Sequence, residues 1–246
     1  MVQRYKLFSY LCTVEWEIIH INETDSTNHW LQENGGERDM VVWADYQTAG
    51  KGLGVNSWES ERGRNLLFSI LYHPHDIPSN RQFSISMAIS LAIADALGEQ
   101  IGDVSIKWPN DIYWRNAKIC GILIENRLSG QTIRESIIGV GINVNQRQFK
   151  SDAPNPISLW QIHGHETDRE SLLRDILGKF THYHHQDVKQ RYISMLYRRK
   201  GFHPYCDQDG TFMAEFVDVE EDGHLLLCKE DGRQCRYAFK EIQYII

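Results

Sequence analysis

The sequence predicts an α+β fold, in which a mixed β-sheet is backed by helices and followed by a small unit made of strands. Short apolar runs bounded by Gly, Asn and Pro indicate buried strands in the first part of the 246-residue chain. Two long apolar or amphipathic stretches indicate helices that cover the sheet. After about residue 200, strand-like segments alternate with turn sequences such as EEDG and EDG. We therefore expect two domains, residues 1–199 and residues 200–246.

The strands of the expected large sheet form an early and a later group. Residues 41–45 and 65–72 are short apolar runs, and residues 81–97 are apolar around most of a helical circumference. Gly98 stands where such a helix commonly ends. A tight hairpin is expected at residues 115–117. The later strands are expected at residues 105–108, 111–114, 118–125 and 136–144.

A second helical region and the C-terminal strands complete the prediction. Residues 167–199 are expected to be largely helical, because apolar residues recur on one face after Thr167 and Glu170, which have capping-box spacing. A unit of about 45 residues is too small to be very stable alone, so we expect the C-terminal unit to dock on the larger domain. It should form a small barrel or a curled sheet from residues 212–219, 224–229 and 233–239.

Composition limits the classes of function. Lysine and arginine total 26 against 33 aspartates and glutamates, and the net charge of -7 opposes a general attraction to nucleic acid or anionic lipid. No stretch approaches the roughly 18 to 20 apolar residues of a membrane span, so we expect neither a signal peptide nor a transmembrane helix. The five cysteines lack CxxC spacing. Reduced thiols and a cytoplasmic location are therefore expected.

Eleven histidines raise the question of a metal site. His182, His184 and His185 interrupt an amphipathic helical pattern, whereas His73 and His75 lie in a turn that contains proline. We favour this structural interpretation, and we expect no metal to be held by the protein alone.

A glycine-rich segment at residues 47–58 is the first candidate for chemistry. Gly50, Gly52 and Gly54 alternate along it, so that backbone amides can approach an anion closely, and Lys51 adds a positive charge. The segment suits phosphate or carboxylate but matches neither the Walker pattern nor the dinucleotide-binding fingerprint. A flexible surface loop is the alternative that the residues leave open.

Polar residues at the ends of apolar strands form the second candidate. Pro109 fixes a bend, after which Asn110 and Asp111 have polar groups free to face a ligand. Lys118 begins the next strand and is either a solvated edge residue or a charge placed for function. Asn143 lies in an apolar run, so it is either a satisfied structural asparagine or a ligand contact.

Four motifs resemble those of biotin protein ligases. They are DSTN at residues 25–28, QTAGKGLGVNSW at 47–58, KWPND at 107–111 and GVGIN at 139–143, and Lys118 follows the start of KWPND by eleven residues. The resemblance covers nearly the whole chain. It implies a class II synthetase-like catalytic domain with a C-terminal domain similar to an SH3 barrel. The implied enzyme is an ATP-dependent biotin--[acetyl-CoA-carboxylase] ligase, which forms biotinyl-AMP and transfers biotin to a lysine.

The resemblance also implies the roles of particular residues. Lys118 matches the lysine at the biotin carboxylate and the α-phosphate, and Asp111 matches a carboxylate near the nucleotide, its metal or the acceptor lysine. Mg²⁺ would arrive with ATP. The implied biotin site consists of Ser26, Thr27, Asn28, Gln47, Gly50, Lys51, Gly52, Leu53, Lys118 and Gly121. The implied ATP site consists of Lys51, Trp58, Asn110, Asp111 and Asn143.

Two departures from the family pattern affect the expected partners and the closing loop. About 20 residues precede the ligase motifs, too few for the helix-turn-helix domain of some members, so specific DNA binding is not expected. The expected partner is a biotin carrier domain, and a homodimer is left open. Leu53 and Asn56 replace two arginines of many relatives. We therefore expect weaker retention of the adenylate.

Two other functions compete with the biotin ligase interpretation. A lipoate ligase or octanoyl transferase has a similar catalytic fold, and the alternative of a different class is a non-catalytic biotin or adenylate binder. The KWPND and GKGLGVNSW pair favours biotin. The placed charge of Lys118 argues against a passive binder.

Overall fold

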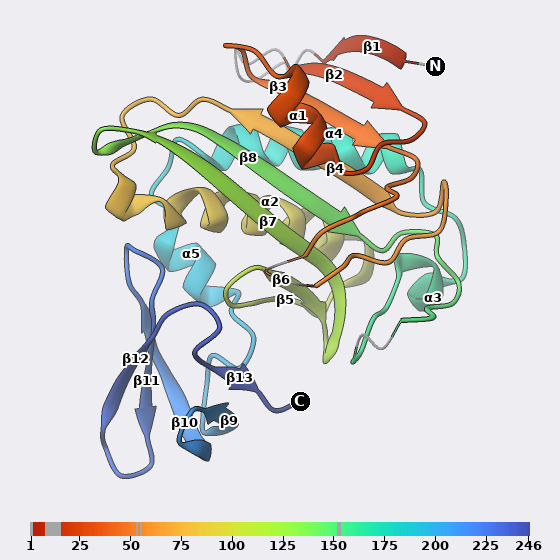
Figure 1. The fold of residues 1–246 in the computed structure, drawn as a ribbon. Helices are drawn as coiled ribbons and strands as arrows, with labels where there is room; N and C mark the ends of the chain where they lie inside the picture. The colour runs from red at the N-terminus through yellow and green to blue at the C-terminus, as the bar shows by residue number, and fades with distance from the viewer. Residues whose placement is uncertain (1, 8–15, 53, 55, 152–153) are drawn as a thin grey trace.

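An eight-stranded sheet dominates the computed structural model, which describes residues 2–7, 16–52, 54, 56–151 and 154–246 (Figure 1). The strand order is β1-β2-β3-β4-β8-β7-β6-β5. β2 and β3 run parallel and the other neighbours antiparallel, so the predicted mixed sheet is confirmed. The strands span Val2–Leu7 (β1), Trp16–Ile21 (β2), Met40–Ala44 (β3), Leu66–Tyr72 (β4), Val104–Lys107 (β5), Asp111–Trp114 (β6), Ala117–Ser129 (β7) and Thr132–Ile142 (β8).

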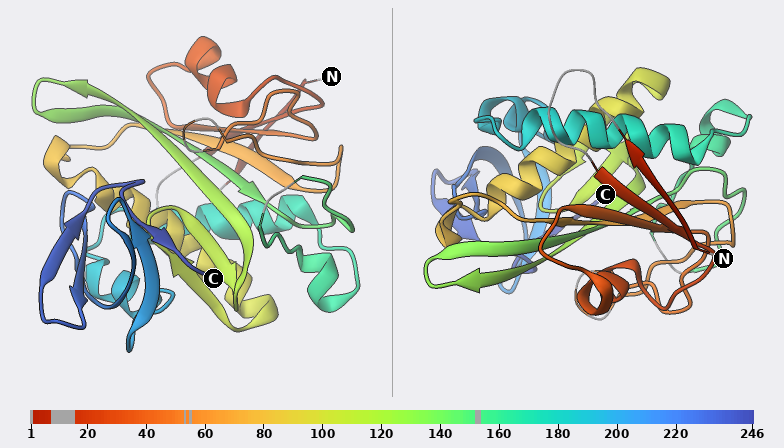
Figure 2. Two further views of the ribbon diagram at one scale, coloured as in Figure 1. Left: turned by 60° about the horizontal axis from the view of Figure 1, so that its bottom comes forward. Right: turned by 90° about the horizontal axis from the view of Figure 1, so that it is seen from above.

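Helices cover both faces of this sheet (Figures 1 and 2). In β2, Ile18 belongs to the main core with α2 and α4, whereas its neighbour Ile19 packs in a second cluster with Leu31 of α1. Because both faces are covered, β3 and β4 are buried along their whole length, and apart from Ser69 their sequences are predominantly apolar. The helices span Thr27–Asn34 (α1), Phe83–Ile101 (α2), Leu159–His163 (α3), Arg169–Tyr183 (α4) and Lys189–Ser194 (α5), with a 3₁₀ turn at Ser79–Arg81.

Helix α2 is longer than expected, because Gly98 does not end it. The helix continues to Ile101, and the chain leaves it at Gly102, whose φ of 60° suits glycine. The Gly102 amide donates to the Gly98 carbonyl at 3.0 Å. A glycine inside a helix costs about 1 kcal/mol relative to alanine. Burial of the apolar residues around it offsets that cost.

The region at residues 167–199 forms two helices rather than one. The expected capping box at Thr167 is wrong, because the Thr167 amide donates to Asn145 Oδ1 at 2.9 Å. Asp168 is the N-cap of α4 instead, and its carboxylate accepts a hydrogen bond of 2.7 Å from the Ser171 amide. Because of these two hydrogen bonds, the helix begins one residue later than the capping-box spacing predicts.

The C-terminal strands form a second, five-stranded antiparallel sheet in the order β12-β11-β10-β9-β13 (Figure 1). The three expected strands are present, and β9 and β13 were missed because they are short and weakly apolar. In the described part of the chain the two edge strands do not pair, so no barrel is closed. The sheet curls nevertheless, since the Tyr237 hydroxyl donates to Asp207 across it at 2.9 Å. The strands span His203–Asp207 (β9), Gly210–Val219 (β10), Leu225–Lys229 (β11), Gln234–Tyr237 (β12) and Gln243–Tyr244 (β13).

The second sheet docks on the first, as expected from its size. The Trp108 indole nitrogen donates to the Gly223 carbonyl at 2.9 Å, and Phe239 packs against the rings of both Trp108 and Phe83. Gly223 has a φ of 96°, and a Cβ there would lie 2.8 Å from Phe83. Buried residues of both sheets form one continuous core. The division at residue 200 therefore stays a prediction.

Two expectations from composition can be compared with the structure. The four described cysteines, Cys120, Cys206, Cys228 and Cys235, carry free thiols. Within the described ranges, no helix is long and apolar enough to cross a membrane.

Candidate active site

Two neighbouring cavities share one wall. The first cavity, of about 190 Å³, lies between the start of α1, the glycine-rich segment and strands β6 to β8. The second cavity, of about 700 Å³, lies between the same segment, β5, β6, residues 149–151 and 154–156, and Gln243 of the second sheet. The residues that line both cavities are Asn56, Ser57, Trp58, Asp111 and Lys118.

Glycines on β7 and β8 give the first cavity its floor. Gly121 and Gly141 are cross-strand partners. A Cβ at Gly141 would lie 2.5 Å from the Trp58 ring, and a Cβ at Gly121 would lie 2.8 Å from it. At Gly139 a Cβ would lie 2.3 Å from Asn28 Oδ1. These three positions therefore require glycine for the Trp58 ring and the Asn28 amide to lie against the sheet.

Hydrogen bonds fix the polar groups at the start of α1. Gln47 Oε1 accepts from the Thr27 amide at 2.7 Å and is 3.0 Å from the Thr27 hydroxyl. The fully buried Ser69 hydroxyl lies 2.7 Å from Thr27 Oγ1 and 2.6 Å from Asn28 Oδ1. Asn28 Nδ2 donates to Glu125 at 2.7 Å. Because its oxygen is engaged, Gln47 offers its amide nitrogen as a donor to the cavity.

An aspartate between two lysines occupies the shared wall. Lys118 Nζ lies 2.6 Å from Asp111 Oδ1, and Lys107 Nζ lies 3.6 Å from Asp111 Oδ2. The short hairpin from β6 to β7 brings Lys118 to this aspartate. Burial lowers the pKa of Lys107, although the charge of Asp111 opposes this effect. The functional alternative for Lys118, a charge placed at a cavity, is the one the geometry supports.

The glycine-rich segment is itself a small hairpin. The Gly52 amide donates to the Asn56 carbonyl at 2.8 Å, and the Trp58 amide donates to the Gly50 carbonyl at 3.0 Å. These two amides are therefore engaged inside the hairpin and do not face an anion. A Cβ at Gly50 would lie 3.0 Å from Gln47 Nε2, so this glycine is needed for packing.

Most of the predicted site residues gather around the first cavity. Asn143 lines the second cavity, and its amide donates to the Ile157 carbonyl at 3.1 Å, which supports the structural alternative for this residue. Gly50 lines neither cavity, and Leu53 lies outside the described residues. The ligand assignments themselves stay predictions. The predicted residues that line the first cavity are Ser26, Thr27, Asn28, Gln47, Lys51, Gly52, Trp58, Asn110, Asp111, Lys118 and Gly121.

Sequence reasoning missed several residues of the site. Gly139 and Gly141 were identified only as part of a motif, although their alternation puts both on one face of β8. Ser69 is a polar residue within an apolar strand, the same signal that identified Asn143. Lys107 was noted for its spacing and was given no role.

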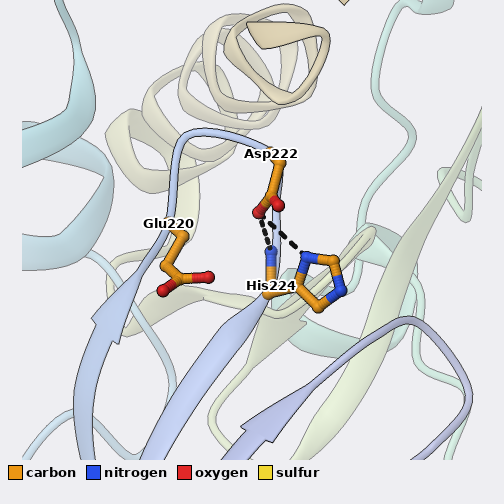
Figure 3. A group of neighbouring side chains, drawn as sticks. All are labelled: Glu220, Asp222 and His224. Carbon is orange, nitrogen blue, oxygen red and sulfur yellow. Dashed lines mark hydrogen bonds and ion pairs between the residues drawn. The ribbon is translucent and has the colours of Figure 1, made fainter. Parts of the chain in front are cut away.

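One group of side chains in the described residues has the spacing of metal ligands. Glu220, Asp222 and His224 lie at the β10–β11 turn, outside both cavities (Figure 3). Asp222 Oδ1 is 2.9 Å from His224 Nδ1 and accepts from the His224 amide at 3.2 Å. The Arg236 guanidinium contacts both carboxylates. The acidic groups thus already have a cation, and we assign no metal to them.

Both groups of histidines noted in the sequence include members with local partners. His73 Nδ1 lies 3.0 Å from Asp39, and His184 Nδ1 lies 3.0 Å from the Phe180 carbonyl. Burial lowers the pKa of His184, whose ring lies against that of His185 at a tilt of 41°. These contacts support the structural interpretation of both groups.

The chain is similar to several known proteins in sequence and in fold. A model described as the biotin/lipoate A/B protein ligase family matches residues 19–143. The bifunctional ligase/repressor BirA of Bacillus subtilis is 30% identical over 231 residues, which are 89% of this chain and 70% of that protein. The biotin--[acetyl-CoA-carboxylase] ligase of Paracoccus denitrificans is 26% identical over 229 residues, covering 86% of this chain and 94% of that protein. A structure of biotin protein ligase from Aquifex aeolicus in complex with biotin and ATP has a TM-score of 0.77 at 26% identity, covering 93% of this chain and 99% of that chain.

These findings define the fold as that of a protein ligase catalytic domain followed by a small C-terminal sheet. The chain belongs to the biotin/lipoate A/B protein ligase family, because the family model matches half of it and a relative matches along most of both chains.

Proposed function

We propose that this chain is a biotin protein ligase, which uses ATP to convert biotin to biotinyl-AMP and then transfers biotin to a lysine of a biotin carrier domain. The observation that carries this proposal is the Lys118–Asp111 pair in the wall between two cavities. A carboxylate in the first cavity and an α-phosphate in the second would meet at Lys118. Both groups are anionic, so a cation at their meeting point stabilises the transition state.

The first cavity suits the ring system of biotin. The ureido group of biotin has one carbonyl acceptor and two N–H donors, which need polar partners when buried. Gln47 Nε2 supplies a donor, and the network of Thr27 and Asn28 supplies further polar atoms. Ile122 and Val140 supply apolar lining for the thioether ring.

In the first half-reaction, a carboxylate oxygen of biotin attacks the α-phosphorus of ATP. The bond from this phosphorus to the bridging oxygen breaks, and pyrophosphate leaves with the electron pair. Lys118 turns from Asp111 to the negative charge that gathers between the substrates. Mg²⁺ bound to the phosphates supplies further positive charge.

The described residues around the cavities favour a metal that arrives on the nucleotide. Their two carboxylates are Asp111 and Glu59. Asp111 pairs with two lysines, and Glu59 accepts from the Lys150 and Ser151 amides at 2.8 and 2.7 Å. Neither carboxylate is left as a ready metal ligand.

In the second half-reaction, the neutral amine of the acceptor lysine attacks the acyl carbon of biotinyl-AMP. A C–N bond forms, the C–O bond to the phosphoryl group breaks, and AMP leaves with the electron pair. Asp111 orients the amine and receives its surplus proton, which then passes to water. Enclosure between the cavity walls limits hydrolysis of the mixed anhydride.

Two assays test this function. Biotin-dependent exchange of labelled pyrophosphate into ATP measures the first half-reaction. Mass spectrometry of a carrier domain incubated with the enzyme, biotin and Mg-ATP measures the complete reaction. Lipoate in place of biotin is the control for the other branch of the family. Exchange that needs lipoate, or biotin binding without exchange, would reject the proposal.

The remaining partner assignments belong to this proposal. The carrier domain of acetyl-CoA carboxylase is the proposed acceptor, a cytoplasmic location fits that acceptor, and a homodimer is left open. We propose no specific DNA binding, since the net charge is -7. Salt-sensitive, sequence-specific binding to a promoter fragment would contradict this last point.

A further inference from the structure

Lys107 holds the second oxygen of the aspartate in the shared wall. It ends β5 and is the cross-strand partner of Asp111, which begins β6. The preceding residue fixes its backbone firmly, because Ile106 donates to the Met195 carbonyl at 2.8 Å and accepts from the Tyr197 amide at 2.9 Å. The backbone from which the Lys107 side chain extends is therefore set by the fold.

The ammonium group of Lys107 is enclosed on three sides. It lies 3.6 Å from Asp111 Oδ2, 5.3 Å from the centre of the Tyr113 ring and 4.9 Å from that of Tyr244. Tyr244 belongs to the second sheet, so both parts of the structure contribute to the enclosure. The side chain is 17% exposed, against 33% for Lys118. Lys107 is thus the more restrained of the two lysines.

The two oxygens of Asp111 have different partners. Oδ1 pairs with Lys118, which lines both cavities, whereas Oδ2 pairs with Lys107, which lines the second. When Lys118 turns to the charge of the substrates, Oδ1 loses its cation and Oδ2 keeps its own. The released oxygen is then free to receive another lysine ammonium group, and the carboxylate stays in place because Lys107 still holds it.

We propose that Lys107 is a positioning residue for acyl transfer, which fixes Asp111 while the acceptor lysine replaces Lys118 at Oδ1. This inference rests on the proposed function. The exchange at Oδ1 makes adenylate formation precede acceptor binding, since the acceptor lysine finds a free oxygen only after Lys118 has moved. The acceptor ammonium first gives up one proton to Asp111, which passes it to water, and the neutral amine then attacks; Asp111 receives the second proton once the C–N bond has formed.

The competing role for Lys107 is direct binding of the triphosphate in the second cavity. The enclosure argues against it, because a phosphate ligand must point its ammonium group at the incoming anion, and this group points at a carboxylate between two rings. The two roles differ in the half-reaction that they affect. A phosphate ligand acts in adenylate formation, whereas a positioning residue for Asp111 acts in transfer.

The test compares both half-reactions in Lys107→Met. Pyrophosphate exchange reports the first, and transfer from chemically synthesised biotinyl-AMP to a carrier domain reports the second. If Asp111 is no longer held in place, the rate of a step that depends on its position falls about tenfold to a hundredfold. We expect transfer to fall at least about tenfold more than exchange, and Lys107→Arg to recover most of the transfer rate, because it restores the cation.

Lys229→Met is the matched control. Lys229 also pairs with an aspartate, Asp207 at 3.2 Å, lies 3.8 Å from the centre of the Phe212 ring and is 14% exposed, yet it lines neither cavity. Both half-reactions should keep their wild-type rates in this variant. Near-ultraviolet circular dichroism checks the fold of each variant. If Lys107→Met does not fold, the loss in transfer relative to the loss in exchange is measured in Lys107→Gln instead, and this ratio tests the inference.

Equal losses in the two half-reactions of the Lys107 variants would overturn the inference, as would a raised half-saturating ATP concentration with normal transfer. The proposed function fails separately, through absence of biotin-dependent exchange in the wild-type chain. The inference about Lys107 then falls with it, whereas equal losses in variants of a wild-type chain that does carry out exchange refute the inference alone.

Discussion

Replacing Gly141 by alanine tests how the floor of the first cavity is built. A Cβ at this position would lie 2.5 Å from Trp58 Cε2, whereas carbon atoms in contact prefer about 3.5 to 4.0 Å. The indole must therefore move by about 1 Å, a misplacement that typically costs about a hundredfold in rate. Trp58 is partly exposed at the shared wall and can move without unfolding the core. We expect biotin-dependent exchange to fall about a hundredfold in a folded protein.

The control for Gly141→Ala is Gly98→Ala. Gly98 lies in α2, and a Cβ there meets nothing within 4 Å. This variant should gain about 0.5 to 1 kcal/mol in free energy of unfolding and keep its activity. Exchange rates, urea unfolding and tryptophan fluorescence measure the two variants. Gly141→Ala with exchange within threefold of wild type and an unchanged tryptophan spectrum would refute the argument that this glycine seats Trp58.

Three further predictions concern charge and capping. Lys118→Ala should slow pyrophosphate exchange about a hundredfold to a thousandfold, about 3 to 4 kcal/mol, with an unchanged unfolding midpoint; near-normal exchange would contradict the role. Burial alone would raise the pKa of Glu59, but hydrogen bonds from Ser151, Lys150 and Gln146 lower it below its ordinary 4.5. The stabilisation is thus present above pH 4.5 and is lost as pH falls through the folded value. Glu59→Gln should lower the free energy of unfolding by about 1 kcal/mol at pH 7 and by less below pH 4.5. A difference between variant and wild type that does not change with pH would argue against a stabilising Glu59 carboxylate. Asp168→Ala should lower the free energy of unfolding, measured by thermal denaturation, by about 1 kcal/mol, because Asp168 caps α4. An equal loss in Thr167→Ala would indicate that Thr167 also caps the helix.

Local spacing was enough to predict the part of the site that lies within one hairpin. Asp111 and Lys118 are separated by a tight turn, and such a turn brings residues on its two strands together whatever surrounds it. Likewise, continuous apolar runs identified β3 and β4, because burial on both faces removes the alternation of polar residues. The mixed sheet and the residues of the charged pair could therefore be predicted from the sequence, whereas β1, β2, α1 and α3 were not.

Tertiary structure decided the features that depend on distant segments. Ser69 meets Thr27 because α1 packs over β4, and Gly141 needs to be glycine because Trp58 comes from another segment and lies upon it. Lys107 acquires its enclosure from Tyr244, more than a hundred residues away. Alternation tells which residues share a face of a strand, but it does not tell what will cover that face. Only the packing of the helices and the second sheet determines that, because contacts between distant segments follow from the fold as a whole.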